Sequence, residues 1–439
     1  MNIGGNSDIL IDFLWNYSHE KFKNILSTCG ETLTVEDFGY ESEDQELFSY
    51  EGVSVRYGDI LIKGAVKFMD SSKDWDLWHK RYPLAVKNIA LVVVVSHDSF
   101  NIDYGGIPTI VVDIPRALSE SYMSLTMSGH DYCPSYMAKH NSMERESILT
   151  RLFIERLQYK EEYVRKCAIG FQSNYNETLI YLFFDTLMIA TRNRDAMREL
   201  CEKVRCGSII SQLSSLQHVE ALLLGSAGLL DARFSADSYI WLLRNIYKEI
   251  ASKFDLTPMN LSRWTISSSN PSQTIWVQLS QLASILFHHK DLLFKVIYAH
   301  TLKDINDLLM VPIGEYWRLH NYPGKEFDSI VGMEYMSQQK RNTFLINCIV
   351  PFMFFYNREN SYDGGDDEYV DVLISLLTST PAEVNKYTRN WTSAGVVVDN
   401  AFDSQALIQL NKIYCDNDRC HKCPLGIGIM ERRMFEERK

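Results

Sequence analysis

The sequence predicts an α+β protein, in which a small mixed β-sheet domain precedes a larger, irregular all-α domain that ends in a cysteine knuckle. Three observations support this fold class. Residues 53–113 contain strand-like runs between glycine turns, residues 142–391 follow helical periodicity, and three cysteines lie close together near the C-terminus. We therefore expect a sheet domain over residues 1–127, a linker over residues 128–141 and a helical domain over residues 142–439.

The composition is that of an ordinary globular protein. The chain has 439 residues, of which 46% are hydrophobic and 23% charged, and this length suits two domains. Its net charge of −12 argues against a protein devoted to coating nucleic acid or an anionic membrane. Nine cysteines, an odd number, do not fit a secreted disulfide scaffold. With neither a signal peptide nor an apolar run long enough to span a bilayer, we expect a cytoplasmic protein without membrane contact.

A helix, a β-hairpin and two further strands are predicted for the first domain. The hairpin alternates apolar and polar residues from Val53 and turns at Gly58-Asp59. The next strand is β-branched and apolar on both faces, which is typical of a central strand covered on both sides. In order, these segments are residues 9–25, 53–69, 89–95 and 108–113.

Three aspartates follow the hairpin. Asp70, Asp74 and Asp76 surround Trp75 and Trp78. Carboxylates at the end of a sheet can hold a magnesium ion for phosphodiester hydrolysis. A solvated loop with aromatic anchors explains the same residues, and charged runs are more often of this kind.

The helical part contains elements of different character and no fixed repeat. Residues 142–168 predict a long helix whose charges, spaced about four apart, are explained by a solvated face. Asp237 is expected to cap a helix with an apolar stripe. The most apolar run, residues 344–356, is interrupted by Asn347 and Pro351 and predicts a buried helix. Because the lengths vary, we expect an irregular helical domain rather than a solenoid.

Three thiols near the C-terminus predict a metal knuckle. Cys415, Cys420 and Cys423 fall within nine residues, on a turn rich in Asp and Asn that Pro424 closes. We expect a structural zinc ion or an iron–sulfur cluster. A closed site has four ligands, so His421 or a distant residue would supply the fourth. The alternative is three reduced thiols in a C-terminal tail.

Four stretches of the helical part form a specific combination of motifs. They read HVEALLLGSAGLL at 218–230, EYWRLHNY at 315–322, FLINCIVPFMFFYN at 344–357, and a segment at 404–423 that runs from SQALIQLNKIYC to the last cysteine. Together they resemble the bacterial family catalogued as domain of unknown function 2851. The N-terminal half resembles it more loosely, through the hairpin, the valine strand and GAVKFMDSSKDW at 64–75.

This resemblance implies that the sheet is related to restriction-endonuclease-like folds. In the family, the second hairpin strand carries a polar series that looks like the metal-binding strand of those nucleases. Two carboxylates there would hold magnesium, and a basic residue would polarise the attacking water. Here the positions read Ala65, Lys67 and Met69, the upstream segment is GYESEDQELF at 39–48, and Val93 stands where the family shows a histidine.

The resemblance also bears on the helical part. Asn270 and Gln278 stand where the family shows two arginines, so phosphate clamps as well as metal ligands are replaced. The Cys-x4-Cys-x2-Cys-Pro spacing is also similar to the iron–sulfur loop of endonuclease-III-like glycosylases, whose fourth, downstream cysteine is missing from this sequence. Cys348 is a candidate remote ligand, although a buried single cysteine is more often part of a core.

Two functions follow as hypotheses. The first is a non-catalytic binding or scaffold protein linked to nucleic-acid processing, with nucleic acid or another protein as partner. The second is a magnesium-dependent nuclease that uses Asp70, Asp74 and Asp76, or Glu51 and Asp59. The replacements favour the first, because site chemistry rather than fold decides function. Carboxylates that converge at a strand end beside a lysine or histidine would favour the nuclease, and apolar side chains there the binding protein.

Overall fold

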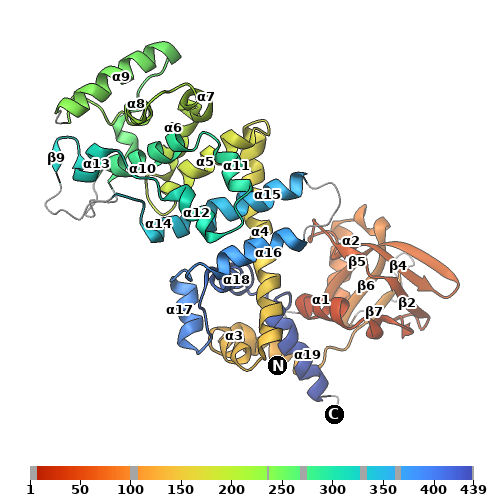
Figure 1. The fold of residues 1–439 in the computed structure, drawn as a ribbon. Coiled ribbons are helices and arrows are strands. Elements are labelled where there is room, and N and C mark those ends of the chain that lie inside the picture. Colours follow the sequence, from red (N-terminus) through yellow and green to blue (C-terminus); the bar gives the residue numbers. More distant parts are fainter. Residues whose placement is uncertain are drawn as a thin grey trace. The chain divides into compact units, whose positions relative to one another are not determined.

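The computed structural model confirms the α+β class, with a mixed sheet near the N-terminus and a mostly helical remainder (Figure 1). It describes residues 7–98, 107–234, 237–266, 274–326, 334–360 and 367–437. The chain forms two compact units. The first comprises Met1–Ile148, Asn390–Val396 and Leu410–Lys439, and the second Leu149–Arg389 and Val397–Gln409. The C-terminal end of the chain therefore belongs to the same unit as the sheet.

The sheet contains an antiparallel and a parallel part. Its order is β1-β2-β4-β5-β6-β7, with β3 paired to β4. β4 and β5 form the predicted hairpin around Gly58-Asp59, and β5, β6 and β7 run parallel. The strands are β1 (Ile25–Leu26), β2 (Thr32–Asp37), β3 (Tyr40–Glu41), β4 (Tyr50–Tyr57), β5 (Ile60–Ser71), β6 (Ile89–Ser96) and β7 (Thr109–Val111).

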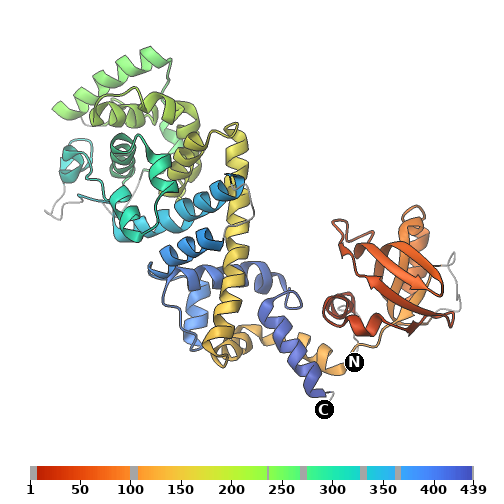
Figure 2. The same cartoon turned by 45° about the vertical axis from the view of Figure 1, so that its right-hand side comes forward.

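Helices cover both faces of the sheet, as Figure 2 shows for α1 (Ser7–Tyr17) and α2 (Ser72–Arg81). On one face Trp15 of α1 meets Phe68 of β5, with ring centroids 5.4 Å apart. The helix predicted over residues 9–25 is wrong beyond Tyr17, because the chain turns at Asn24 (φ +52°) and enters β1.

The segment predicted as a linker, residues 128–141, is instead helical as far as Ala138. It forms the second half of α3 (Arg116–Ala138), which continues through Pro134. Cys133 and Met137 are buried, and α3 packs against α19 (Pro424–Glu437). This packing outweighs the weak helix propensity that glycine, proline and serine confer.

The second unit is an irregular assembly of helices, as predicted, with one small hairpin of β8 (His320–Tyr322) and β9 (Lys325–Glu326). Asp237 caps α9 as expected, because its Oδ1 accepts from the backbone N–H groups of Tyr239 and Ile240. The α-helices from α4 on, of which α4 begins in the first unit, are α4 (Ser142–Gly170), α5 (Tyr175–Leu187), α6 (Arg194–Val204), α7 (Cys206–Ile210), α8 (Leu216–Ser226), α9 (Ser238–Phe254), α10 (Ile275–His288), α11 (Leu292–Ile297), α12 (Leu302–Leu309), α13 (Glu315–Leu319), α14 (Gln338–Phe344), α15 (Val350–Asn360), α16 (Asp367–Thr378), α17 (Lys386–Ser393) and α18 (Ala401–Gln409).

The long charged helix α4 is less solvated than its sequence predicts. Glu161 is only 3% exposed, and its carboxylate lies 2.6 Å from Arg165 and 2.5 Å from Arg358. A solvated face therefore does not explain all of its charges, because this acid is buried among two arginines. None of the described helices combines the length and apolar character that crossing a membrane requires.

Candidate functional site

The strand positions that the family resemblance assigns to metal ligands are apolar and packed. Ala65 and Met69 of β5 are 3% and 8% exposed and belong to a buried cluster with Trp75 and Trp78 of α2. Val93, on the neighbouring strand, is fully buried on the opposite face of the sheet, where it is paired with Phe68. Ala65 and Met69 share their face with Val92 and Val94. Hydrophobic packing against α2 thus occupies this face of the sheet.

Lys67 lies between Ala65 and Met69 on β5, and its side chain is hydrogen-bonded to the loop before β4. Its Nζ donates to the carbonyl oxygens of Gln45 (2.9 Å) and Glu46 (3.0 Å), and it lies 5.9 Å from the centroid of the Trp78 ring. Burial lowers the pKa of Lys67, and the neighbouring charges of Asp8, Asp44 and Glu46 oppose this effect. Two of the three ammonium hydrogens therefore hold the loop before β4 against the sheet.

Two of the predicted aspartates, Asp70 and Asp74, act electrostatically on a third acid, Asp8. Asp70 ends β5 next to Ser71, Asp74 lies in the first turn of α2, and Asp8 lies in the first turn of α1. Burial, then Asp70 and, more weakly, Asp74, raise the pKa of Asp8 to about 6, whereas Lys67 lowers it. Three carboxylates thus share one electrostatic neighbourhood. The sequence prediction missed Asp8, whose only signal is an acid at a helix start.

The other predicted acids lie apart from this group. Asp76 Oδ1 is buried and has no hydrogen-bond partner among the described residues. Glu51 accepts from Ser42 Oγ (2.5 Å), and Asp59 is exposed at the hairpin turn. Within the described ranges, no three His, Cys, Asp or Glu side chains are arranged as ligands of one metal ion.

The three predicted cysteines influence one another electrostatically, and Cys133 takes part in the same interactions. Cys415 begins a short 3-10 turn, and Cys423 directly precedes α19. Burial, followed by Cys423, raises the pKa of the Cys420 thiol to about 12. Burial, followed by Cys423 and Cys420, does the same for Cys133 of α3. The pKa of the Cys415 thiol is also raised. Burial is the main cause, and the charges of Cys423, Cys133 and Cys420 add to it.

The two fourth ligands named from the sequence have other neighbours. His421 turns to Asp12, with Nε2 3.7 Å from Oδ2, and burial lowers its pKa to about 4. Cys348 is fully buried in the second unit. Burial and the charge of Asp185 raise the pKa of its thiol, and a hydrogen bond with Thr186 lowers it. Cys133 is the described residue that accompanies the three thiols. Its position far upstream on another helix left no signal in the sequence.

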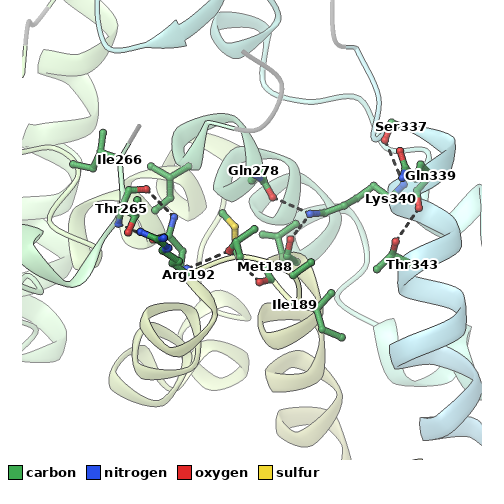
Figure 3. Close-up of a pocket in the computed structure, with 15 residues that line it drawn as sticks. Met188, Ile189, Arg192, Thr265, Ile266, Gln278, Ser337, Gln339, Lys340 and Thr343 are labelled. Atoms are coloured by element: carbon green, nitrogen blue, oxygen red, sulfur yellow. Dashed lines mark hydrogen bonds between the residues drawn. The ribbon is translucent and has the colours of Figure 1, made fainter. Parts of the chain in front are cut away.

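The second unit contains a pocket of about 470 Å³, which we call the Lys340 pocket (Figure 3). It lies between the end of α5, the start of α10 and helix α14. None of its described lining residues is acidic, and two are basic. The lining residues are Leu187, Met188, Ile189, Ala190, Thr191, Arg192, Asn193, Thr265, Ile266, Ile275, Gln278, Ser337, Gln339, Lys340 and Thr343.

Lys340 extends from α14 across this pocket toward α10 (Figure 3). Its Nζ donates to Gln278 Oε1 (2.9 Å) and to the carbonyl oxygen of Leu187, at the end of α5. Burial lowers the pKa of Lys340 to about 8, and no carboxylate of the described ranges opposes this effect. An ammonium group has three N–H donors, so one stays available beyond these two described acceptors.

Gln278, which lines the pocket, is one of the two positions that the family resemblance singles out in the helical part. The resemblance assigns an arginine to this position, and here the side-chain oxygen of Gln278 accepts from Lys340. The second such position, Asn270, lies outside the described residues. Arg192, on the loop after α5, is exposed at the pocket.

A further acid, Glu220 of α8, was missed by the sequence prediction although it lies in the quoted motif at 218–230. It is fully buried, and the hydroxyl groups of Ser280 and Tyr239 donate to its carboxylate. Burial raises the pKa of Glu220 to about 7, although Ser280, Tyr239 and Trp317 each lower it. These hydrogen bonds connect α8 with α9 and α10 in the interior of the second unit. Its signal was a single acid in an otherwise apolar helix.

Comparison with known proteins gives one match. A family model described as "Protein of unknown function (DUF2851)" matches residues 8–386, which is well over half of the chain. The quoted stretch at 404–423, with its three cysteines, lies outside this match. No curated protein and no solved structure matches the chain.

Proposed function

Because the chain belongs to the family described as "Protein of unknown function (DUF2851)", whose description assigns no activity, we propose a function from the geometry of its sites. The protein is a non-catalytic binding protein that holds an anionic, phosphate-bearing ligand in the Lys340 pocket. The observation that carries this proposal is the half-buried ammonium group of Lys340, which has no carboxylate partner among the residues that the structure describes.

The electrostatics of the pocket support an anionic ligand. Taking a cation out of water is costly unless an opposite charge or hydrogen bonds offset the loss. Gln278 and the Leu187 carbonyl offer dipoles only, so a bound anion would supply the missing charge. Arg192 adds a second positive group, and no acid among the described lining residues competes.

The size and the other polar groups of the pocket support a small molecule. A volume of about 470 Å³ falls within the range of ordinary ligand sites, roughly 300–1,000 Å³. The hydroxyl group of Ser337, which accepts from the backbone N–H of Lys340, provides a further donor at its wall, whereas the hydroxyl groups of Thr191 and Thr343 already donate to the carbonyl oxygens of Met188 and Gln339. Lysine, arginine and hydroxyl groups together suit phosphate oxygens. A nucleotide is the ligand of this class that would connect the pocket with nucleic-acid processing.

Calorimetric titration tests the proposal with inorganic phosphate and a nucleoside monophosphate as probes. We expect Lys340→Met to weaken binding at least about tenfold, the loss of one charge-assisted hydrogen bond. Lys295→Met serves as the control, because Lys295 pairs with Asp291 outside the pocket. Circular dichroism should show that Lys340→Met stays folded, since methionine removes a costly buried charge. Wild-type protein that binds neither probe would contradict the proposal.

The same titration should depend on pH. With a pKa of about 8, Lys340 loses its proton as the pH rises from 7 to 9, so affinity for either anion should fall over this range. Binding that takes up protons near pH 8 would support the assignment, because an anion raises the pKa of the lysine beside it. Equal affinity at pH 7 and pH 9 would contradict it.

A metal-dependent nuclease stays the second candidate, because Asp8, Asp70 and Asp74 share one neighbourhood with Lys67. Against it stand the packed Ala65 and Met69 and the engagement of Lys67 with two carbonyl groups. We expect no cleavage of DNA or RNA with magnesium or manganese. Cleavage that Asp70→Asn abolishes and the control Asp59→Asn retains would establish the nuclease instead.

The cytoplasmic location is part of the proposal and rests on the cysteine usage of the sequence.

A further inference from the structure

We propose that Cys133, Cys415, Cys420 and Cys423 form a four-thiolate site for a thiophilic metal centre, with Cys133 of α3 as the ligand that the C-terminal knuckle lacks. The site is independent of the Lys340 pocket and belongs to the first unit, which also contains the sheet.

The knuckle itself has a fixed backbone. The N–H of Cys423 donates to the carbonyl oxygens of Arg419 (3.1 Å) and Cys420 (3.3 Å), which closes the turn before α19. Gly426 lets the first turn of α19 approach this loop, because a Cβ atom there would lie 2.0 Å from the Cys420 carbonyl oxygen. Two cysteines separated by two residues on such a turn are the usual half of a zinc knuckle.

Helix α3 presents Cys133 to this knuckle. Tyr122 OH donates to the carbonyl oxygen of Asp418 (3.2 Å), which lies between the first and second knuckle cysteines. Cys133 follows Tyr122 by about three helical turns and thus lies on the same face of α3. Cys133 and Cys423 are 8% and 5% exposed, so both thiols are enclosed where α3 packs against α19.

The chemistry of four thiols, two of them buried and two half-buried, favours a metal over a redox pair. A reactive cysteine needs an electropositive setting that favours its thiolate. Here Cys133 and Cys423 are buried where α3 packs against α19, and Cys420 and Cys423 have the spacing of a metal half-site. A divalent cation would offset the cost of placing thiolates in such an enclosed setting, because the thiolate is the species that binds it. The described side chains do not yet meet at one point, so the proposal requires the thiols to rotate toward the metal as it binds.

Elemental analysis of the full-length protein, purified without oxygen, tests the proposal. We expect one zinc ion per chain, or iron and sulfide with visible absorption, and these two results identify the metal. Cys133→Ser should lose the metal on challenge with a chelator. Cys201→Ser is the matched control, because Cys201 is also a buried helical cysteine, 2% exposed, and should retain it.

A second measurement covers the case in which Cys133→Ser does not fold. Native wild-type protein is alkylated with and without prior chelation, and the modified cysteines are located by mass spectrometry. We expect chelation to open Cys133, Cys415, Cys420 and Cys423 to alkylation together. Protein that holds no metal even after zinc titration would overturn the proposal, as would disulfides among these cysteines or full metal retention by Cys133→Ser.

Discussion

The carboxyl group of Glu220 lies fully buried between α8, α9 and α10, with Ser280 and Tyr239 as donors. Its pKa is about 7 in the folded protein, against an ordinary value of 4.5. An unfolded chain therefore releases this proton at lower pH than the folded chain does. The stabilising effect is complete below about pH 4.5 and is lost as the pH rises through 7.

We therefore expect Glu220→Gln to unfold at higher urea concentration than the wild type at pH 8. The difference between the two proteins should grow by about 3 kcal/mol from pH 4.5 to pH 8, because one pKa unit corresponds to about 1.4 kcal/mol. Urea unfolding at several pH values measures it. Glu315→Gln, which changes an exposed acid in α13, is the control and should follow the wild type. Parallel pH profiles of Glu220→Gln and wild type would refute this assignment.

Single residues differ in how far the sequence reveals their role. Glu220 stands alone in an apolar run, which already indicates a buried and bonded acid. Lys340 occurs in the polar segment SQQKRN, which looks like an ordinary solvated helix start. Its burial depends on α5 and α10, which meet it only in the folded chain. Pocket residues of this kind have no local signal.

At the scale of the element, strand β5 depends on one glycine. An added Cβ at Gly64 would lie 2.4 Å from the Asn88 carbonyl oxygen and 3.2 Å from Ala90 Cβ. The close approach of β5 to the start of β6 thus requires the absence of a side chain. The same strand carries Ala65 and Met69, so this approach also sets the packed face that replaces a metal site.

We expect Gly64→Ala to destabilise the sheet by about 1–3 kcal/mol, the usual cost of forcing an extra methyl group into a packed site. Hydrogen exchange of the β5 amides should become faster. Gly58→Asn is the control in the same hairpin, because nothing lies within 4 Å of that position and asparagine tolerates its positive φ of +57°. Unchanged exchange in Gly64→Ala would show that the strands can separate without cost.

The apolar helix predicted over residues 344–356 is present, but its first part is not an α-helix. Residues Leu345–Ile349 form a π-helical turn between α14 and α15. Pro351 follows it, and a proline lacks the N–H group that an α-helix needs. Lys160 of α4 donates to the carbonyl oxygen of Ile346 (2.8 Å) and to Asn347 Oδ1 (3.1 Å). The sequence signalled the interruption through Asn347 and Pro351, whereas the lysine that stabilises it is a long-range contact.

For the molecule as a whole, the fold class and the β4–β5 hairpin could be predicted because they follow local periodicity and turn residues. Which segments of the chain belong to which of the two units could not be predicted. Tyr122 and Asp418 are in hydrogen-bond contact although 296 residues separate them. A contact over such a distance leaves no periodic pattern, so the C-terminal knuckle was expected in the helical domain, and Cys133 was taken for part of a linker. The three knuckle cysteines were visible because their ligand spacing is local.

The distribution of the first unit over both ends of the chain has a consequence for its synthesis. The sheet leaves the ribosome before the second unit, whereas the knuckle and α19 emerge only after all of the second unit. The second unit can therefore fold before the first unit is complete, and the Cys133 face of α3 stays uncovered until the knuckle has been synthesised. A stop codon between Gln409 and Cys415 would consequently leave the sequence of the second unit whole but remove the knuckle and α19 from the first.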